Sequence, residues 1–404
     1  MTEGAVRRVV ILGAGYAGMR AALDIGRRCT GCEDVETILV DRNPYHQFRT
    51  ELHKAAAGTA PGDVSVPIER ILHAHPDVHF EQAEVTRIDV GGHVLERKDA
   101  PPLPFDKLAV AVGGEPETFD IPGLDHALSI QSVNSARVIR DHIEDAFRRA
   151  ALQEDAAARR RGMTVIVGGG GLTGVEFVFE LADRLPELCR SAGAPKEEAR
   201  LILIEASSSI LKGFDEHQIA LAQKRLDEKQ IESHFNVKIT SVEPHVVNLD
   251  NGARLETDSF VWTGGVRGNH LVSQAMSCDP RGRARVNHYL QSSDCEDVFV
   301  AGDSALAIDA ESGQPVGPTA QNAIQQGGLL AYNLCAALEQ RPLKPYEPRN
   351  LGKVASLGPG YGVAHLGGLN ISGLPAAWLK ELIALHYVYS LGGAKLLLQQ
   401  LVHA

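Results

Sequence analysis

Two clusters of glycine, each directly after a short β-branched run, have the spacing in this sequence that points most clearly to chemistry. The first, Gly13-Ala14-Gly15-Tyr16-Ala17-Gly18, follows the run 9–12 and opens a helical pattern over residues 19–28. Glycines at these positions permit a tight turn, let backbone N–H groups approach a pyrophosphate at a helix N-terminus, and allow close helix packing. This first glycine loop (residues 13–18) therefore predicts a dinucleotide site formed by its six residues.

An acidic residue at the end of the next predicted strand strengthens this site. Residues 38–41 read Ile-Leu-Val-Asp, so Asp41 is placed to hydrogen-bond a ribose diol. Arg42, which follows it, is assigned to the same cofactor. The alternative is a glycine-rich turn that binds nothing.

The same arrangement recurs in a second glycine loop (residues 169–174), Gly169-Gly170-Gly171-Leu172-Thr173-Gly174, after the run 164–167. Strand 201–205 ends in Glu205, and we assign Gly169, Gly171, Gly174 and Glu205 to a second dinucleotide. A carboxylate ~4 Å from a 2′-phosphate would cost a few kcal/mol at an effective dielectric of ~20, so Glu205 favours NADH over NADPH. The alternative is that Glu205 faces solvent.

Length and composition limit the classes of protein that fit. At 404 residues the chain suggests two or three domains, and 44% hydrophobic with 23% charged residues is typical of a globular α/β protein. A net charge of -11 would be repelled by phosphate backbones, which argues against nucleic acid as a partner. Six scattered cysteines and the lack of a secretory signal favour the cytoplasm, and no run reaches the ~18 apolar residues of a membrane span.

The repeated glycine loops predict two Rossmann-like dinucleotide-binding domains in an α/β fold. Turns at 101–104, 113–116 and 121–123 are interpreted as the crossover between them, with a second crossover near Gly264-Gly265. Segment 297–303 resembles a strand returning to the first domain, which would make that domain discontinuous and the second one inserted. We therefore expect the first domain at 1–120 and 266–348, the inserted domain at 121–265, and a C-terminal unit at 349–404.

Residues 132–161 are rich in Ala and Arg and contain neither Gly nor Pro. This composition predicts one long, exposed helix whose charges form a solvated face.

Two nested dinucleotide domains followed by Ala301-Gly302-Asp303 resemble the two-dinucleotide-binding flavoproteins. The resemblance implies FAD in the first domain and a nicotinamide nucleotide in the second, with Asp303 at the ribityl chain and pyrophosphate of the flavin. Hydride would then pass from NADH to FAD, which carries the chemistry.

Cysteines decide between branches of that superfamily, because disulfide reductases place a cysteine pair beside the flavin. Cys29 and Cys32 fall after the first helix, away from the predicted flavin ring, and are interpreted as surface or small core thiols. The remaining cysteines lack the arrangement of sulfide:quinone reductases, a function that stays as an alternative: Cys189, Cys278, Cys295 and Cys335.

Several stretches resemble the type II NADH:quinone oxidoreductases, single-chain, non-pumping peripheral membrane enzymes of respiration. The matching segments run over almost the whole chain: 43–46, 50–53, 82–86, 117–123, 172–177, 261–268 and 319–327. The most specific is Ala-Gln-x-Ala-x-Gln-x-Gly at 320–327, which in the family lies under the flavin ring and frames the quinone pocket.

The resemblance implies a role for five residues. Ala320 and Gln321 contact the flavin, Gln321 and Gln325 line the quinone pocket, Val85 brackets the adenine of FAD, and Glu176 lies near the nicotinamide and flavin. The implied partners are NADH, FAD and a membrane quinone.

The residues themselves support part of this. Glu176 lies one turn into a helix that continues apolar, where an uncompensated carboxylate is costly and thus a candidate for function; alternatively, the helix dipole favours it there. Gln321 and Gln325, at i and i+4, share one helix face. The alternative is that this face is ordinary polar surface. No residue is assigned to a metal.

The C-terminal unit predicts two amphipathic helices separated by Gly392-Gly393. The first, 375–390, has an apolar stripe and aromatic residues suited to lipid headgroups, and in the second, apolar residues oppose a polar face. The apolar stripe of the first helix consists of Trp378, Leu382, Leu385 and Tyr389, and Leu379 and Ile383 widen it. The aromatic residues suited to lipid headgroups are Trp378, Tyr387 and Tyr389. The apolar face of the second helix consists of Ala394, Leu397, Leu398 and Leu401, and its polar face of Lys395, Gln399 and His403.

From Gly373 onward, Lys380 and Lys395 against Glu381 give two minus one, a net +1, so apolar insertion would have to do most of the anchoring. We expect peripheral attachment to the cytoplasmic side of the cell membrane, retained FAD and NADH oxidation after truncation near Pro375, and loss of liposome binding. The alternative is that the stripes pack on the protein's own core or a dimer partner, and a homodimer is left open. Two other functions also remain: a membrane-docked flavin NADH sensor, and a soluble NADH-dependent reductase of an iron–sulfur or rubredoxin partner.

Overall fold

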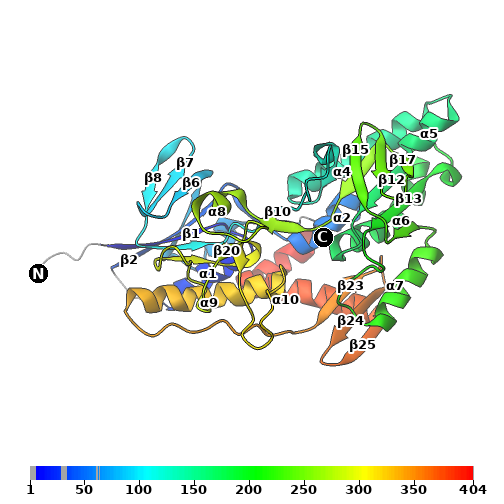
Figure 1. The fold of residues 1–404 in the computed structure, drawn as a ribbon. Helices are drawn as coiled ribbons and strands as arrows, with labels where there is room; N and C mark the ends of the chain where they lie inside the picture. Colours follow the sequence, from blue (N-terminus) through cyan, green and yellow to red (C-terminus); the bar gives the residue numbers. More distant parts are fainter. Residues whose placement is uncertain (1–5, 29–33, 61, 63, 404) are drawn as a thin grey trace, which may run out of the picture.

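Two parallel β-sheets organise the chain in the computed structural model, which describes residues 6–28, 34–60, 62 and 64–403 (Figure 1). The first sheet has the strand order β21-β9-β1-β2-β5, and all four pairings are parallel. Its strands are β1 (Arg7–Leu12), β2 (Val35–Asp41), β5 (Val78–Gln82), β9 (Lys107–Val110) and β21 (Val298–Val300).

The second sheet repeats this pattern with the order β11-β18-β12-β13-β14, again all parallel. Its strands are β11 (Leu128–Ser129), β12 (Thr164–Gly168), β13 (Arg200–Glu205), β14 (Glu232–Phe235) and β18 (Ser259–Trp262). The central strands read as continuous Val, Ile and Leu runs because helices and loops cover both faces of a parallel sheet. The prediction of two Rossmann-like units in an α/β fold is confirmed.

Each parallel sheet carries a three-stranded antiparallel meander on one face: β6 (Val85–Asp89), β7 (Val94–Arg97) and β8 (Ala100–Pro104) on the first, and β15 (Ile239–Glu243), β16 (Val246–Leu249) and β17 (Arg254–Glu256) on the second. The predicted turn at 101–104 is therefore wrong, because those residues form strand β8. The chain passes between the units through β10 (Gly114–Pro116), which pairs antiparallel with β19 (Val266–Gly268) (Figure 1).

Helices cover the opposite faces. Helix α1 (Tyr16–Arg28) packs on α9 (Ala320–Leu338) so closely that a side chain on Gly327 would overlap the Ala17 carbonyl. Helix α6 (Leu172–Ala192) follows β12 and packs with α2 (Leu52–Ala57) and α4 (Val133–Ala151). The remaining described α-helices are α3 (Ile68–Leu72), α5 (Ala156–Gly162), α7 (Glu216–Glu228), α8 (His270–Ala275) and α10 (Leu374–His403).

The predicted single exposed helix at 132–161 is wrong on two counts. The chain forms α4 and α5, and Asp155 begins the second helix by accepting hydrogen bonds from the backbone N–H groups of Ala157 and Ala158. One side of α4 is buried in the core of the second unit through Ile139, Ile143 and other apolar residues. Its apolar residues recur at helical spacing, a pattern that the high charge content conceals.

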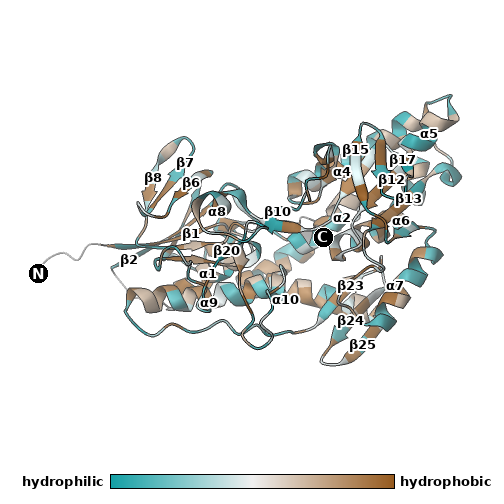
Figure 2. Ribbon diagram, viewed as in Figure 1, coloured by the Kyte–Doolittle hydropathy of each residue, from teal (hydrophilic) through white to brown (hydrophobic). Residues whose placement is uncertain are grey.

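The C-terminal unit contains β23 (Lys353–Ser356), β24 (Gly362–Leu366) and β25 (Leu369–Gly373), an antiparallel sheet next to α10. Gly392 and Gly393 have non-helical backbone angles, so α10 is two helices joined at a kink, as predicted. Figure 2 shows hydrophobic strands inside the second unit and hydrophilic residues along α7. No helix among the described residues is long and apolar enough to cross a membrane.

Candidate functional site

The first glycine loop turns tightly between β1 and α1. Gly13 has φ +101°, and a Cβ there would lie 2.5 Å from the carbonyl oxygen of Ala111; a Cβ on Gly18 would overlap the Gly13 carbonyl. Only glycine fits both positions, because one backbone angle is left-handed and the other brings helix and loop into direct contact. The loop thus has the close backbone packing that the sequence predicted.

Asp41 closes this loop at the end of β2. Its carboxylate accepts hydrogen bonds from the backbone N–H groups of Ala14, at 2.7 Å, and Asn43, at 2.8 Å. Val85 is buried at the start of β6, near the same edge of the sheet, whereas the side chain of Arg42 is exposed. The backbone N–H of Ala83 joins these segments by donating to the Asp41 carbonyl.

The second glycine loop repeats this geometry. Gly169 has φ +115° and lies so close to Thr263 that a Cβ would approach its carbonyl group to 2.8 Å. Glu205, at the end of β13, accepts from the N–H of Gly170 at 2.6 Å and from that of Ser207 at 2.7 Å. The alternative that Glu205 simply faces solvent is therefore wrong, since its carboxylate is bound to the loop as Asp41 is bound to Ala14.

Both glycine loops have the backbone geometry that a dinucleotide site requires. In each, left-handed and closely packed glycines bring backbone N–H groups to a helix N-terminus, where an anionic pyrophosphate is favoured. A Cβ on Gly171 would meet nothing within 4 Å, so this loop is open on the side where a ligand would lie.

Asp303 lies where the chain crosses between the two units. The short helix Gly302–Ser304 follows β21, and Gly302, with φ +74°, donates its N–H to the side-chain oxygen of Gln326 at 2.6 Å. Burial raises the pKa of Asp303, while the nearby Arg49 guanidinium and the Gly114 backbone N–H lower it. The structure thus brings a half-buried carboxyl and an arginine together next to β10.

Gln321 and Gln325 share one face of α9, as predicted, and Ala320 is the first residue of that helix. The structure gives both glutamines backbone partners that the sequence did not reveal. Gln325 accepts from the Arg349 N–H at 2.8 Å and donates to its carbonyl at 2.9 Å, and Gln321 accepts from the Leu351 N–H at 2.9 Å. These three bonds hold the connector 349–351 against the start of α9.

Glu176 is buried in α6, but the expectation of an uncompensated carboxylate is wrong. Its Oε1 is hydrogen-bonded to the Lys380 ammonium group of α10 and accepts from the Ser356 N–H at 2.9 Å. The buried His53 places Nδ1 3.6 Å from the other carboxylate oxygen. Burial raises the pKa of Glu176, and the charge of Lys380 opposes that rise. Lys380, a charged residue within an otherwise apolar stretch of the tail, was the available signal for this pair.

A chain of charged groups leads from this pair toward the surface. Lys54 lies 2.9 Å from Glu51 and 2.6 Å from Glu381, an exposed residue of α10. Burial lowers the pKa of His53 well below its ordinary value, with the positive charges of Lys380 and Lys54 adding to the effect. Neither His53 nor Lys54 was among the site residues predicted from the sequence.

Residues of α10 also reach the first glycine loop. Tyr387, predicted at the level of lipid headgroups, is instead packed beside Tyr16 and His46, because its ring completes the core of the first unit. Lys380, counted as a surface charge, is buried with Glu176. By contrast, Trp378, Leu382 and Tyr389 are exposed, as predicted for one stripe of the helix.

The thiols lie apart. Cys189 is in α6, Cys335 in α9, and Cys278 and Cys295 are in loops before β21, so these four do not form a pair beside either glycine loop. Cys29 and Cys32 fall outside the described residues.

The chain is similar to proteins of known function over most of its length. The family model for pyridine nucleotide-disulphide oxidoreductases matches residues 7–327, which include both glycine loops. Type II NADH:quinone oxidoreductases of Staphylococcus saprophyticus and Staphylococcus aureus are each 35% identical over 392 residues, covering 96% of this chain and 96% of theirs.

Solved structures show the same fold at lower identity. NDH2 from Plasmodium falciparum in complex with NADH has a TM-score of 0.87 at 18% identity, covering 98% of this chain and 97% of that one. The sulfide:quinone oxidoreductase of Aquifex aeolicus has a TM-score of 0.77 at 18% identity, covering 95% and 91%.

The fold and its paired glycine loops define an oxidoreductase that binds two dinucleotides. Within this class, the chain belongs to the pyridine nucleotide-disulphide oxidoreductase family and, by its full-length relatives, to the type II NADH:quinone oxidoreductases. Its cofactors are FAD and NADH.

Proposed function

We propose that this chain transfers electrons from NADH, through bound FAD, to a quinone. The observation that carries the proposal is the similarity to type II NADH:quinone oxidoreductases at 35% identity across 96% of both chains. When bound, FAD accepts hydride from the nicotinamide and passes the electrons on. The protein supplies binding, orientation and proton carriers around it.

The two glycine loops divide the binding between them. The first loop with Asp41 and the half-buried Asp303 holds FAD, and the second loop with Glu205 holds NADH. This assignment is supported by the matched carboxylate-to-loop hydrogen bonds of Asp41 and Glu205. The position of Asp303 beside β10, where the chain passes from one unit to the other, supports its place near the flavin.

The quinone half of the reaction uses the start of α9 and the buried pair of Glu176 and Lys380. Gln321 and Gln325 fix the connector 349–351, and so shape the wall of a pocket in which the quinone is reduced. Reduction of a quinone to a quinol consumes protons. Glu176, buried and paired with Lys380, is the group we assign to holding a proton there.

Peripheral attachment to the cytoplasmic side of the cell membrane is part of the proposal. The stripe of Trp378, Leu382, Ile383 and Tyr389 on the first part of α10 is exposed, as are Leu398 and Leu401 on the second part. Burying four or five such side chains would contribute ~1.5–3 kcal/mol each. Lys380 and Glu381 are both engaged within the protein, which leaves Lys395 and the same net charge of +1, so apolar insertion has to do most of the anchoring.

Truncation near Pro375 is not a suitable test of this attachment. It would remove Val388, Leu391 and Leu396 from the core of the first unit and leave Glu176 buried without its lysine. A full-length chain with Trp378→Ser and Leu382→Ser changes only exposed side chains. It should retain FAD and NADH oxidation with a soluble acceptor but no longer sediment with liposomes.

The matched control is Leu369→Ser, an exposed leucine in β25 outside α10. Sedimentation of the double variant to the same extent as wild type would contradict membrane attachment through α10. A change of oligomeric state without loss of liposome binding would instead assign the stripe to a homodimer.

The activity itself is tested with the purified yellow protein. NADH oxidation should depend on a soluble quinone analogue, while a disulfide acceptor should not increase it and sulfide should not replace NADH as reductant. Flavin reduction by sulfide, or NADH consumption driven by a disulfide, would move the chain to another branch of the superfamily. Turnover too slow to follow in the steady state with the quinone would favour the NADH sensor.

A further inference from the structure

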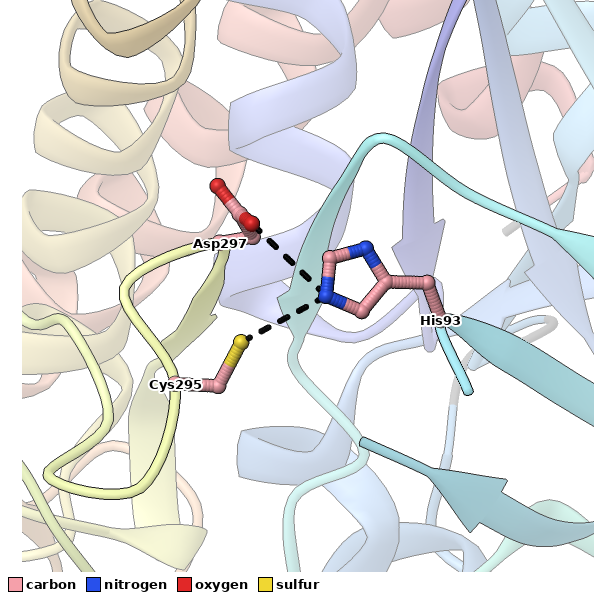
Figure 3. A group of neighbouring side chains, drawn as sticks. All are labelled: His93, Cys295 and Asp297. Carbon is pink, nitrogen blue, oxygen red and sulfur yellow. Dashed lines mark hydrogen bonds and ion pairs between the residues drawn. The ribbon is translucent and has the colours of Figure 1, made fainter. Parts of the chain in front are cut away.

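Three side chains with metal-binding atoms meet at the edge of the first unit, away from both glycine loops. His93 lies in the turn between β6 and β7, and Cys295 and Asp297 lie just before β21. The imidazole of His93 points at the other two (Figure 3), with Nε2 3.8 Å from the Cys295 sulfur and 3.6 Å from Asp297 Oδ2. All three ligand atoms lie within 4.8 Å of one another.

We propose that His93, Cys295 and Asp297 form a Zn²⁺ site with water as the fourth ligand. Imidazole, thiolate and carboxylate are the ligands that zinc takes in proteins, at about 2.0–2.3 Å. In a tetrahedron, such bonds place neighbouring ligand atoms roughly 3.3–3.6 Å apart. The separations of 3.6 and 3.8 Å from His93 Nε2 are therefore within a few tenths of an ångström of zinc-bound values, and the Cys295 and Asp297 ligand atoms lie within 4.8 Å of each other.

The imidazole is held in this orientation by the protein. His93 has a left-handed backbone, φ 54°, which a residue other than glycine seldom adopts unless its surroundings require it. Its ring stacks on Phe105, with centroids 5.3 Å apart and planes at 11°, and its carbonyl accepts from the Phe105 N–H at 3.0 Å. Little reorganisation is needed for metal binding, because the ring already faces the thiol and the carboxylate.

Lys107 modulates the site. Its ammonium group pairs with Asp297 Oδ1 and so leaves Oδ2 facing His93. The same positive charge repels a divalent cation, which weakens binding. Replacing Lys107 with a neutral side chain should therefore tighten the metal, whereas replacing any of the three ligands should weaken it.

A metal here would join parts of the chain that are far apart in sequence. His93 belongs to the antiparallel meander that begins at Val85, and Cys295 and Asp297 precede the edge strand of the parallel sheet. Because the unfolded chain does not hold these groups together, Zn²⁺ should stabilise the folded protein. The Cys295 thiol releases its proton to solvent when the metal binds.

The test uses the full-length holoprotein with Cys29→Ser and Cys32→Ser, so that this thiol pair does not compete for the probe. Zn²⁺ is titrated by calorimetry, and Co²⁺ is followed through its ligand-field absorption at wavelengths longer than the flavin bands. We expect one Zn²⁺ per chain, tetrahedral Co²⁺ absorption, and a higher temperature of unfolding with Zn²⁺.

Four substitutions in this background make the test specific. Cys295→Ser and Asp297→Asn should each weaken Zn²⁺ by about tenfold or more, Lys107→Gln should strengthen it severalfold, and Cys278→Ser, at a similarly half-buried thiol, should leave it unchanged. Absence of binding, or binding that is unaffected by Cys295→Ser, would overturn the proposal. Retained FAD and circular dichroism identify variants that fold normally.

Discussion

The phenol of Tyr387 donates a hydrogen bond to Nε2 of His46 at 2.9 Å, which links the C-terminal helix to the first glycine loop through one buried imidazole. Nδ1 of the same ring lies 2.7 Å from the carbonyl oxygen of Ala14. A carbonyl only accepts, so Nδ1 carries the hydrogen and Nε2 is left to accept from Tyr387. Docking of α10 and the shape of the first glycine loop are therefore coupled.

Tyr387→Phe should loosen FAD while keeping the ring packing around Tyr16. The change leaves Nε2 of His46 buried without a partner, which costs about 1–3 kcal/mol. We expect a lower temperature of flavin release, followed by the rise in flavin fluorescence on heating. Tyr389→Phe, at an exposed tyrosine two residues later, is the control, and equal release temperatures in the two variants would contradict the coupling.

Acid should destabilise the protein between about pH 6.5 and pH 4 through His46. Burial lowers the pKa of this ring to about 4, so over this window the unfolded chain binds a proton that the folded chain does not. The stabilising contribution is complete above pH 6.5 and is lost as the pH falls toward 4. It amounts to about 3 kcal/mol at most, since each pKa unit corresponds to ~1.4 kcal/mol.

Unfolding temperatures of wild type and His46→Asn at pH 7.5 and pH 5 check this prediction. The drop on acidification should be smaller in the variant, which has no ring to protonate. His53, whose pKa is also lowered by burial, contributes in the same direction and remains in both proteins. An equal drop in both would show that His46 is not responsible.

The buried pair of Glu176 and Lys380 should behave as a unit. Glu176→Gln leaves an ammonium group buried alone and Lys380→Met leaves a carboxylate, each at a cost of about 3–5 kcal/mol, whereas the double variant removes both charges. The double variant should therefore unfold at a higher temperature than either single one. Additive losses would indicate that the two side chains act independently.

Glu176→Gln should also change the pH dependence of quinone turnover while FAD is retained. Burial raises the pKa of this carboxyl, so the wild-type profile should contain an ionisation that the variant lacks. Identical profiles would indicate that this carboxylate serves only to pair with Lys380 and does not take part in turnover.

Changing Glu205 should relax the preference for NADH over NADPH. In Glu205→Arg, a positive charge replaces the carboxylate at the end of β13 and can pair with a 2′-phosphate. The ratio of kcat/KM for the two nucleotides should shift toward NADPH, although both values fall because the bonds to Gly170 and Ser207 are lost. Equally efficient use of NADPH by wild type would show that Glu205 does not contact the ribose of the nucleotide.

Gln325→Ala should impair the quinone half-reaction more than the NADH half-reaction. Its loss frees the connector at Arg349, whereas the second glycine loop stays intact. Stopped-flow reduction of FAD by NADH should be nearly normal while steady-state quinone turnover falls several-fold. Equal losses in both would point to general damage at the flavin. Asn322→Ala, on the same turn of α9, is the comparison.

The sequence by itself determined the two dinucleotide units, because the glycine loops and the strands around them are local patterns. Gly13 and Gly169 adopt positive φ angles that glycine tolerates without strain, and the β-branched runs before them form the strands β1 and β12. The kink in α10 follows from the glycine pair at 392 and 393, and the shared face of Gln321 and Gln325 follows from their i, i+4 spacing.

Only the tertiary structure decided which distant groups meet. The carboxylate of Glu176 is separated from Lys380 by 204 residues, and His93 from Cys295 by 202, and no local spacing encodes either contact. The apolar stripes of the tail are visible in its own sequence, and they predict a membrane anchor that can be removed. The contacts of Tyr387 with His46 and of Lys380 with Glu176 join the tail to the rest of the protein, and they involve residues far away in the sequence. Amphipathic spacing shows that a helix has two faces, but the packing partner of each face is set by the folded chain.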